Sequence, residues 1–146
     1  MKCIIAATDG SKGAERAVGV AAALAKTCDA DLWIVSVPGA ERRISTEEFE
    51  TYARSEHLSP NQVLISAAEE PLSRGEGIAV TNGATHVKTE VQSGDPAHAI
   101  MESARDKHAD LIVVGRRGRG RLAGLLLGSV SQKVVALAPC AVLVVP

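Results

Sequence analysis

Runs of hydrophobic residues recur along the chain and predict the strands of a sheet. Four of these runs are almost wholly aliphatic and cover residues 3–7, 32–37, 111–114 and 141–145. Continuous apolar runs of this length are typical of parallel strands that are buried on both faces. A fifth run, residues 87–91, alternates between apolar and polar positions. That alternation predicts an edge strand with one face in water.

Segments with a helical pattern lie between these runs. Residues 11–28 are rich in alanine, and their apolar positions form one helical stripe, made of Ala14, Ala17, Val18, Ala21, Ala22 and Ala25. Asp95 and Pro96 supply an N-cap and a first-turn proline for a helix over 97–108. A last short helix is expected over 129–138. Strand and helix alternate, so the sequence predicts an α/β fold with an open parallel sheet and right-handed crossovers.

The middle of the chain contains a charged connection and a long helical segment. Within the connection, a helix is expected over residues 47–57. A longer helix begins at Pro60, after a serine that suits the N-cap position. We expect Pro71, Gly75 and Gly77 to bend or weaken this helix, because proline and glycine are poor residues for a helix interior.

Composition and charge narrow the class of protein. Of the 146 residues, 46% are hydrophobic and 23% are charged, which is typical of a folded globular chain. No repeat or linker is evident, so we expect one domain over residues 1–146. The net charge of −1 argues against binding nucleic acid or acidic membranes through bulk charge. The three cysteines are too few and too scattered for a disulfide framework or a zinc site. No membrane span or signal peptide is recognised, so we expect a cytoplasmic protein.

Candidate chemistry lies where the predicted strands end, because ligands of open parallel sheets bind beyond the carboxyl ends of the strands. Thr8 and Asp9 follow the first strand and place a carboxylate at this edge. The fourth strand leads into a loop rich in glycine and arginine, which runs from Gly115 to Gly128 and Ser129 at the start of the last helix. The arginines of this loop are Arg116, Arg117, Arg119 and Arg121. Glycines let the backbone approach a ligand closely, and the N–H groups of a helix N-terminus bind anions. The sequence therefore predicts a phosphate-binding loop.

Two nucleotide-binding motifs are excluded by residues that the chain lacks. Residues 118–123 fit the dinucleotide pattern G-x-G-x-x-G/A, but that motif requires an acidic residue about 20 positions later. No Asp or Glu follows Asp110. A Walker loop is absent as well. That motif requires a glycine directly before its lysine, whereas Lys133, the one lysine after Gly115, directly follows a glutamine. The arginines form an alternative basic patch, but nucleic acid is the weakest interpretation because no aromatic residues lie between them.

The loop resembles the ATP-binding signature of the universal stress proteins. The matching pattern is Gly115, two residues, Gly118, nine residues, then Gly128 and Ser129. Further likeness lies in the segments 9–11, 94–97, 128–131 and 138–140, so that the resemblance covers almost the whole chain. It implies a Rossmann-like sheet of the adenine nucleotide alpha hydrolase type, with helices on both faces and five parallel strands in the order 3-2-1-4-5. It also implies ATP, with or without Mg²⁺, in the crevice at the carboxyl ends of the strands.

The resemblance also assigns roles to individual residues. Asp9 would contact the ribose, and the backbone near Val37 would face the adenine. The phosphates would be held by backbone N–H groups and hydroxyls, those of Gly115, Gly118, Gly128, Ser129, Val130 and Ser131. Thr8 and Arg116 complete the predicted nucleotide site. Three residues depart from the family pattern, since Ser36 replaces a frequent histidine, Arg116 a small hydroxylated residue and Ala141 a proline.

Several alternatives stay open from the sequence. Asp9 is also placed to cap the helix that begins near Ser11, and the loop glycines also suit tight turns. Ser129 is not expected to be a nucleophile, because it lies in no G-x-S-x-G elbow and no histidine follows it. The four histidines show no metal-binding spacing. We therefore expect a nucleotide-dependent stress-response or signalling module with no catalytic residues. The alternatives are a slow nucleotide hydrolase on the same scaffold and a dimeric stress protein that has lost ATP binding.

The last strand predicts how copies of the chain assemble. In the order 3-2-1-4-5, strands three and five form the edges of the sheet. Strand three carries Lys88 and Glu90, which discourage pairing with another chain, whereas Ala141–Val145 carries no charge. We expect a two-fold homodimer through antiparallel pairing of this strand, as the resemblance also implies. An unidentified protein partner would then recognise the nucleotide-bound state.

Overall fold

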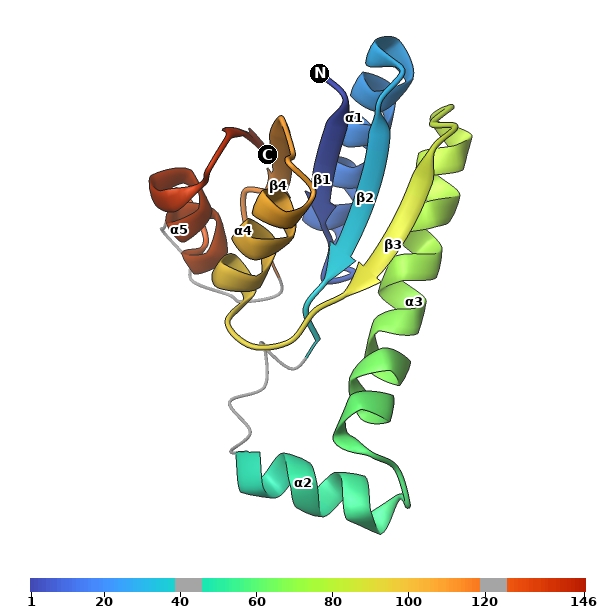
Figure 1. The fold of residues 1–146 in the computed structure, drawn as a ribbon, viewed down its shortest axis with the longest axis vertical. Helices are drawn as coiled ribbons and strands as arrows, with labels where there is room; N and C mark the ends of the chain where they lie inside the picture. Colours follow the sequence, from blue (N-terminus) through green and yellow to red (C-terminus); the bar gives the residue numbers. More distant parts are fainter. Residues whose placement is uncertain (39–45, 119–125) are drawn as a thin grey trace.

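The sheet has five parallel strands in the order β3-β2-β1-β4-β5 (Figure 1). The structure is a computed structural model, and it describes residues 1–38, 46–118 and 126–146. The strands are β1 (Cys3–Ala7), β2 (Asp31–Ser36), β3 (Val87–Val91), β4 (Leu111–Gly115) and β5 (Ala141–Val145). The predicted number of strands, their parallel direction and their order are all confirmed.

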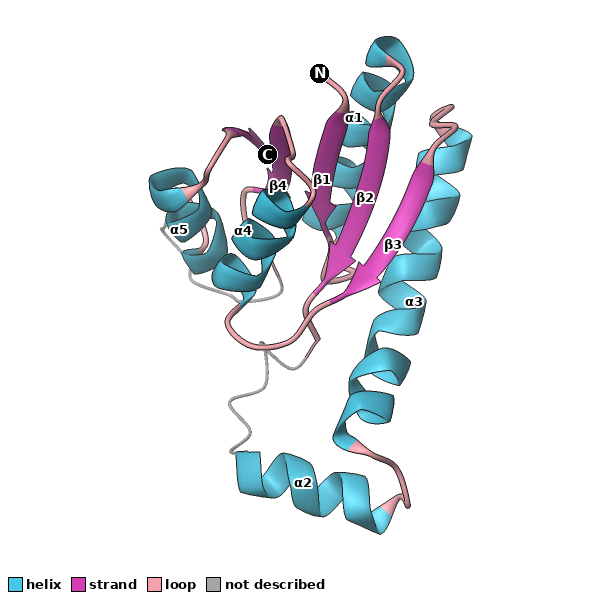
Figure 2. Cartoon of the chain, in the orientation of Figure 1, coloured by secondary structure: helices cyan, strands magenta, loops and turns pink. Residues whose placement is uncertain are grey.

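Helices cover both faces of the sheet, as the predicted fold requires (Figure 2). They are α1 (Lys12–Cys28), α2 (Thr46–Ser55), α3 (Pro60–Thr81), α4 (Pro96–Asp106) and α5 (Ser129–Leu137). Helices α1 and α3 pack on one face, and α4 and α5 pack on the other. Side chains alternate between the faces, so Ile4 contributes to the α1 side and Ile5 to the α4 side. None of the described helices is both long and apolar enough to cross a lipid bilayer.

The alanine stripe of α1 explains how closely that helix approaches the sheet. All six predicted stripe residues are buried, including Ala17 and Ala21, which have no exposed surface. Small side chains let the helix backbone lie near the strands, where it covers Ile4 and Leu32. Ser11 caps the helix, because its hydroxyl oxygen accepts a hydrogen bond from the backbone N–H of Ala14 at 3.2 Å.

The boundaries of two strands differ slightly from the predicted ones. Strand β2 begins at Asp31 and ends at Ser36, so that Val37 lies just beyond it. Strand β4 includes Gly115, whose Cα pairs in register with that of Val145. Both shifts are of one residue, and they leave the predicted site residues at the carboxyl edge.

Helix α3 is continuous, and none of the three residues predicted to bend or weaken it interrupts the helix. It runs unbroken through Pro71, Gly75 and Gly77 over 22 residues. Tertiary packing explains Gly75, because a Cβ there would lie 3.2 Å from Cγ2 of Ile34. The absence of a side chain at this position thus lets α3 pack closely against β2. The first part of α3 extends past the carboxyl edge of the sheet, with α2 at its far end (Figure 1).

Edge strand β3 holds a polar network on the side of α4. The carboxylate of Glu90 accepts hydrogen bonds from the hydroxyl of Ser103 at 2.8 Å and from Nε2 of Gln92 at 2.9 Å, and it pairs with Nζ of Lys107 at 2.6 Å. Burial raises the pKa of Glu90, but the hydrogen bonds from these three side chains outweigh it and hold the pKa below its ordinary value. Nζ of Lys107 also lies 4.5 Å from the ring centre of Trp33. The predicted polar face of this strand is therefore partly covered by α4.

Candidate functional site

Three segments that are distant in sequence meet at the carboxyl edge of the sheet. They are the turn between β1 and α1, the end of β4 through Gly118, and the start of α5. A Cβ on Gly118 would lie 2.5 Å from Oδ2 of Asp9, which places the first two segments in contact. The backbone N–H of Gly128 donates to the carbonyl oxygen of Arg116 at 2.8 Å, which joins the second and third. The residues that the sequence proposed for this edge are therefore brought together.

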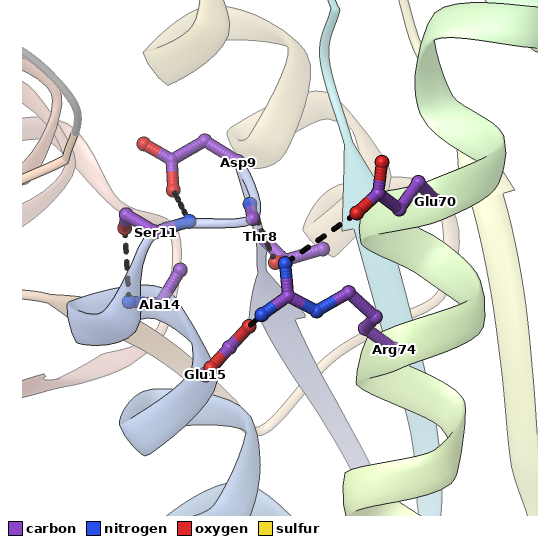
Figure 3. A network of polar contacts seen from close by, with 8 residues as sticks. Thr8, Asp9, Ser11, Ala14, Glu15, Glu70 and Arg74 are labelled. Atoms are coloured by element: carbon purple, nitrogen blue, oxygen red, sulfur yellow. Dashed lines mark hydrogen bonds and ion pairs between the residues drawn. The ribbon is translucent and has the colours of Figure 1, made fainter.

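The turn after β1 is organised by its own side chains (Figure 3). Oδ1 of Asp9 accepts a hydrogen bond from the backbone N–H of Ser11 at 2.9 Å, and Oγ1 of Thr8 accepts one from Gly10 at 3.2 Å. Gly10 has a φ of 78°, a left-handed conformation that favours glycine. Since Ser11 provides the N-cap of α1, the alternative that Asp9 caps this helix is wrong. The turn instead holds the Asp9 carboxylate beside Gly118.

Gly115 is required by packing between backbones. A Cβ at Gly115 would lie 2.9 Å from the carbonyl carbon of Gly13 and 3.0 Å from its oxygen. A Cβ at Gly13 would in turn lie 2.9 Å from the carbonyl oxygen of Arg117. The end of β4 therefore lies directly against the first turn of α1, with no room for side chains between them. Gly13 was not predicted to be a site residue, although a glycine in the first turn of a helix is a signal that the sequence offers.

The start of α5 is held against the end of β4. The hydroxyl of Ser131 is buried and lies 2.7 Å from the carbonyl oxygen of Gly115 and 3.2 Å from that of Arg116. A hydroxyl has one proton to donate, so this serine positions the loop backbone. Its contact with a phosphate stays a prediction. The neighbouring Ser129 is exposed and Val130 is half-buried.

The N-terminus of α5 lacks the side-chain cap that three other helices have. Ser11, Ser59 and Asp95 each accept a first-turn N–H through their side chains, at α1, α3 and α4. The N-cap of α5 is Gly128, which has no side chain to accept such a bond. The first-turn N–H groups of α5 thus have no side-chain acceptor from their cap, and the positive end of the helix dipole lies at this edge. This arrangement suits an anion such as phosphate.

Residues at the end of β2 lie on the α4 side of the same edge. Val37 is half-buried and packs against the apolar cluster under α4 and α5, so its side chain belongs to the core. Ser36 is buried, and its carbonyl oxygen accepts a hydrogen bond from the N–H of Gln92 at 2.9 Å. The contact of the backbone near Val37 with an adenine stays a prediction.

A charged network beside Thr8 was not predicted. Arg74 of α3 forms ion pairs with Glu15 of α1 and, at 3.6 Å, with Glu70 one turn earlier in its own helix (Figure 3). The spacing of Glu70 and Arg74 is a signal that the sequence offers. The contact with Glu15 depends on how α1 and α3 pack. This ion pair joins the two helices next to the candidate site.

Another polar contact links α4 and α5 near their N-termini. Oδ1 of Asp95 lies 3.4 Å from Nζ of Lys133, and Oδ2 accepts the backbone N–H of His98 at 3.0 Å. The hydrogen bond from His98, followed by the neighbouring Lys133 ammonium, holds the pKa of Asp95 below its ordinary value. The carboxylate is therefore charged at neutral pH and available as a cap.

Part of the predicted loop lies outside the described residues, namely Arg119, Arg121 and the segment through residue 125. In the described part of the chain, no group of three or more His, Cys, Asp or Glu side chains is arranged to hold a metal ion. Asp9 is the carboxylate that the described residues place against Gly118. A metal at this edge would take most of its ligands from a bound phosphate or from water.

The fold and this edge define the chain as a doubly wound α/β domain, a class whose ligand sites lie beyond the carboxyl ends of the strands. The family model described as "Universal stress protein family" matches residues 1–146. A universal stress protein of Thermus aquaticus is 39% identical over 144 residues, which cover 99% of this chain and 98% of that protein. The chain therefore belongs to the universal stress protein family.

Two solved structures of the family contain nucleotides. A universal stress protein in complex with cAMP is 30% identical, with a TM-score of 0.69 over 99% of this chain and 95% of that one. A universal stress protein of Archaeoglobus fulgidus in complex with dAMP is 25% identical, with a TM-score of 0.68 over 100% of this chain and 98% of that one. The fold predicted from the resemblance, that of the adenine nucleotide alpha hydrolases, is confirmed.

Proposed function

We propose that the chain binds an adenine nucleotide, specifically ATP, at the carboxyl edge of its sheet. The observation that carries this proposal is the meeting of Asp9, the end of β4 and the uncapped N-terminus of α5. The two solved relatives that contain cAMP and dAMP support an adenine nucleotide as the class of ligand. Occupancy of the site would then control the protein as a stress-response or signalling module, with its place of action in the cytoplasm as the sequence predicts.

Each part of the edge suits a different part of a nucleotide. The first-turn N–H groups of α5 and the backbone of Gly118 would hold phosphates, with the Ser129 hydroxyl as a further donor. The Asp9 carboxylate would accept hydrogen bonds from ribose hydroxyls, which are stronger than those to a neutral acceptor. The backbone near Val37 would face the adenine. Ser131 would act indirectly, by fixing the backbone of Gly115 and Arg116.

We propose binding rather than rapid hydrolysis as the role of this site. Hydrolysis needs a positioned water and, in most cases, a metal ion that neutralises charge on the phosphates. Mg²⁺, if bound with ATP, would supply that neutralisation through phosphate oxygens and Asp9. Glu15, a second carboxylate near this turn, is paired with Arg74 (Figure 3). A single-turnover assay with Mg²⁺ tests the hydrolase alternative, which requires a rate well above that of free ATP and its loss in Asp9→Ala.

A calorimetric titration of nucleotide-stripped protein with ATP tests the proposal. Asp9→Asn removes the charge but keeps an oxygen that can accept the Ser11 N–H, so the turn is preserved. We expect this variant to bind ATP about tenfold more weakly, since a hydrogen bond to a charged group contributes about 1.5–3 kcal/mol. Gly128→Val should abolish binding, because its Cβ would already be in van der Waals contact with the backbone of Arg116 and Arg117 at 3.4 Å, and its two methyl groups would take up space at the N-terminus of α5 where the phosphates are proposed to bind.

The matched control is Asp106→Asn, the same change on an exposed residue at the end of α4. It should bind ATP as the wild-type protein does. Absence of binding of ATP, AMP and cAMP to the wild-type protein would overturn the proposal. The remaining alternative would then be a dimeric stress protein without a nucleotide.

We also propose that the chain forms a homodimer through β5. This strand is an edge of the sheet, and its exposed or half-buried residues from Ala141 to Val144 carry no charge. Strand β3, the other edge, has exposed side chains at Lys88 and Thr89. We expect Val144→Lys to give a monomer by light scattering while far-ultraviolet circular dichroism stays unchanged. An unchanged mass in a folded variant would exclude this interface.

A further inference from the structure

A concave site lies on the α1 side of the segment 116–118. It is a cavity of about 330 Å³ between the first turn of α1, the end of β4 and the residue after β5. Its lining residues are Ser11, Lys12, Gly13, Arg16, Arg116, Arg117, Gly118 and Pro146. Lys12, Gly13, Arg16 and Pro146 do not belong to the nucleotide site proposed above. The volume is at the lower end of the range of small-molecule sites, so a compact ligand would fit.

This cavity is rich in cationic side chains. Four of its lining side chains are cationic, and none of the described residues that line it is acidic. Lys12, Arg16, Arg116 and Arg117 form no ion pair with any described side chain, whereas Arg74 and Lys107 do. Like charges gathered around a hollow repel one another unless an anion lies between them. These cations therefore favour an anionic ligand.

Two features prepare the cavity for an anion with several oxygens. Nε of Arg16 donates to the main-chain oxygen of Pro146 at 2.9 Å, which fixes the guanidinium at the cavity wall. The two terminal nitrogens of a guanidinium match phosphate oxygens in a two-pronged hydrogen bond. The close backbone contact of Gly13 with Arg117 keeps the two sides of the cavity together.

We propose that this cavity binds a phosphate chain, meaning a di- or triphosphate group. A single phosphate would leave most of the four cations unmatched, whereas a chain of phosphates has several negative charges in a compact volume. Such a group can come from two sources, the terminal phosphates of a nucleotide bound across segment 116–118 or a free inorganic polyphosphate. For the first source the proposal rests on the proposed function, whereas a free polyphosphate would bind without a nucleotide.

The test is a calorimetric titration of the wild-type protein with inorganic tripolyphosphate at physiological ionic strength. The double variant Lys12→Gln and Arg16→Gln should bind it at least about tenfold more weakly, because two charge-assisted hydrogen bonds are lost. The control pair, Arg54→Gln with Arg105→Gln, removes the same charge from exposed sites on α2 and α4 and should bind as the wild type does. No binding to the wild type, or an equal loss in both pairs, would overturn the proposal.

Two further titrations separate the sources and the two sites. If saturating tripolyphosphate weakens ATP binding, the ligand is the nucleotide's own phosphate chain; if both bind together, it is a free polyphosphate. AMP, which has no phosphate chain, should bind equally to the wild type and to the Lys12 and Arg16 double variant. AMP binding without tripolyphosphate binding would refute the cavity proposal and leave the proposed function standing, and the reverse result would refute only the proposed function.

Discussion

Gly115→Ala is the substitution whose effect the structure specifies most closely. The new Cβ would lie 2.9 Å from the carbonyl carbon of Gly13, 3.0 Å from its oxygen and 3.2 Å from the N of Ala14. Carbon atoms in good contact are about 3.5–4.0 Å apart, so one backbone must move away by roughly 0.6 Å or more. Neither can yield as a flexible side chain would, because one is the end of a central strand and the other the first turn of α1. The substitution therefore separates two backbones that also form the wall of the candidate site.

The expected cost follows from two opposing contributions. Overpacking of this kind destabilises by about 1–3 kcal/mol. Alanine regains about 0.5–1 kcal/mol, because glycine loses more conformational freedom on folding. We expect a net loss of about 1–2 kcal/mol in the free energy of unfolding. With a urea m-value of about 2 kcal/mol/M, the midpoint should fall by roughly 0.5–1 M.

Urea unfolding followed by the fluorescence of Trp33, the single tryptophan, measures this change. Gly77→Ala is the matched control, since a Cβ there meets nothing within 4 Å and the site is in the interior of α3. It should raise the free energy of unfolding by about 1 kcal/mol, the difference in helix propensity between alanine and glycine. A Gly115→Ala protein as stable as the wild type, beside a stabilised control, would show that these backbones do not lie in contact.

Two further predictions concern the polar contacts. Ser131→Ala should destabilise by about 1 kcal/mol, because the carbonyl oxygen of Gly115 loses the hydroxyl donor that lies 2.7 Å from it. The variant should also weaken ATP binding, and unchanged values of both would refute the positioning role of Ser131. Glu90→Gln should destabilise by about 1–2 kcal/mol at pH 7, because Lys107 loses its charged partner. Since the folded pKa of Glu90 lies below its unfolded value, its stabilisation is full above the unfolded pKa of about 4.3 and is lost as pH falls through the folded pKa. Urea midpoints of the wild type and the Glu90→Gln variant should therefore converge in acid, and a gap that stays constant from pH 7 to pH 3 would exclude this account.

The sequence by itself determined the strands, their order and the edge that holds the candidate site. Interior parallel strands are buried on both faces, so they appear in the sequence as short continuous aliphatic runs. Local signals also placed the caps, since the Asp95 side chain accepts the N–H of His98 as the sequence predicted. The glycine and serine spacing of the loop carried the family resemblance, which implied the strand order and also predicted which residues would bind a nucleotide.

Tertiary structure alone decided how the site residues face one another. No local pattern shows that Gly115 lies against Gly13, or that Arg74 crosses to Glu15, because both contacts join segments whose approach depends on the packing of α1. Helix α3 illustrates the same limit: intrinsic propensity predicted weakness at Gly75, whereas packing on Ile34 needs that glycine. The family resemblance predicted Ser131 as a phosphate ligand, whereas its hydroxyl lies 2.7 Å from a carbonyl oxygen of the loop backbone. Sequence specifies which groups reach the edge, and the directions of their donors and acceptors are fixed only when distant backbones pack together.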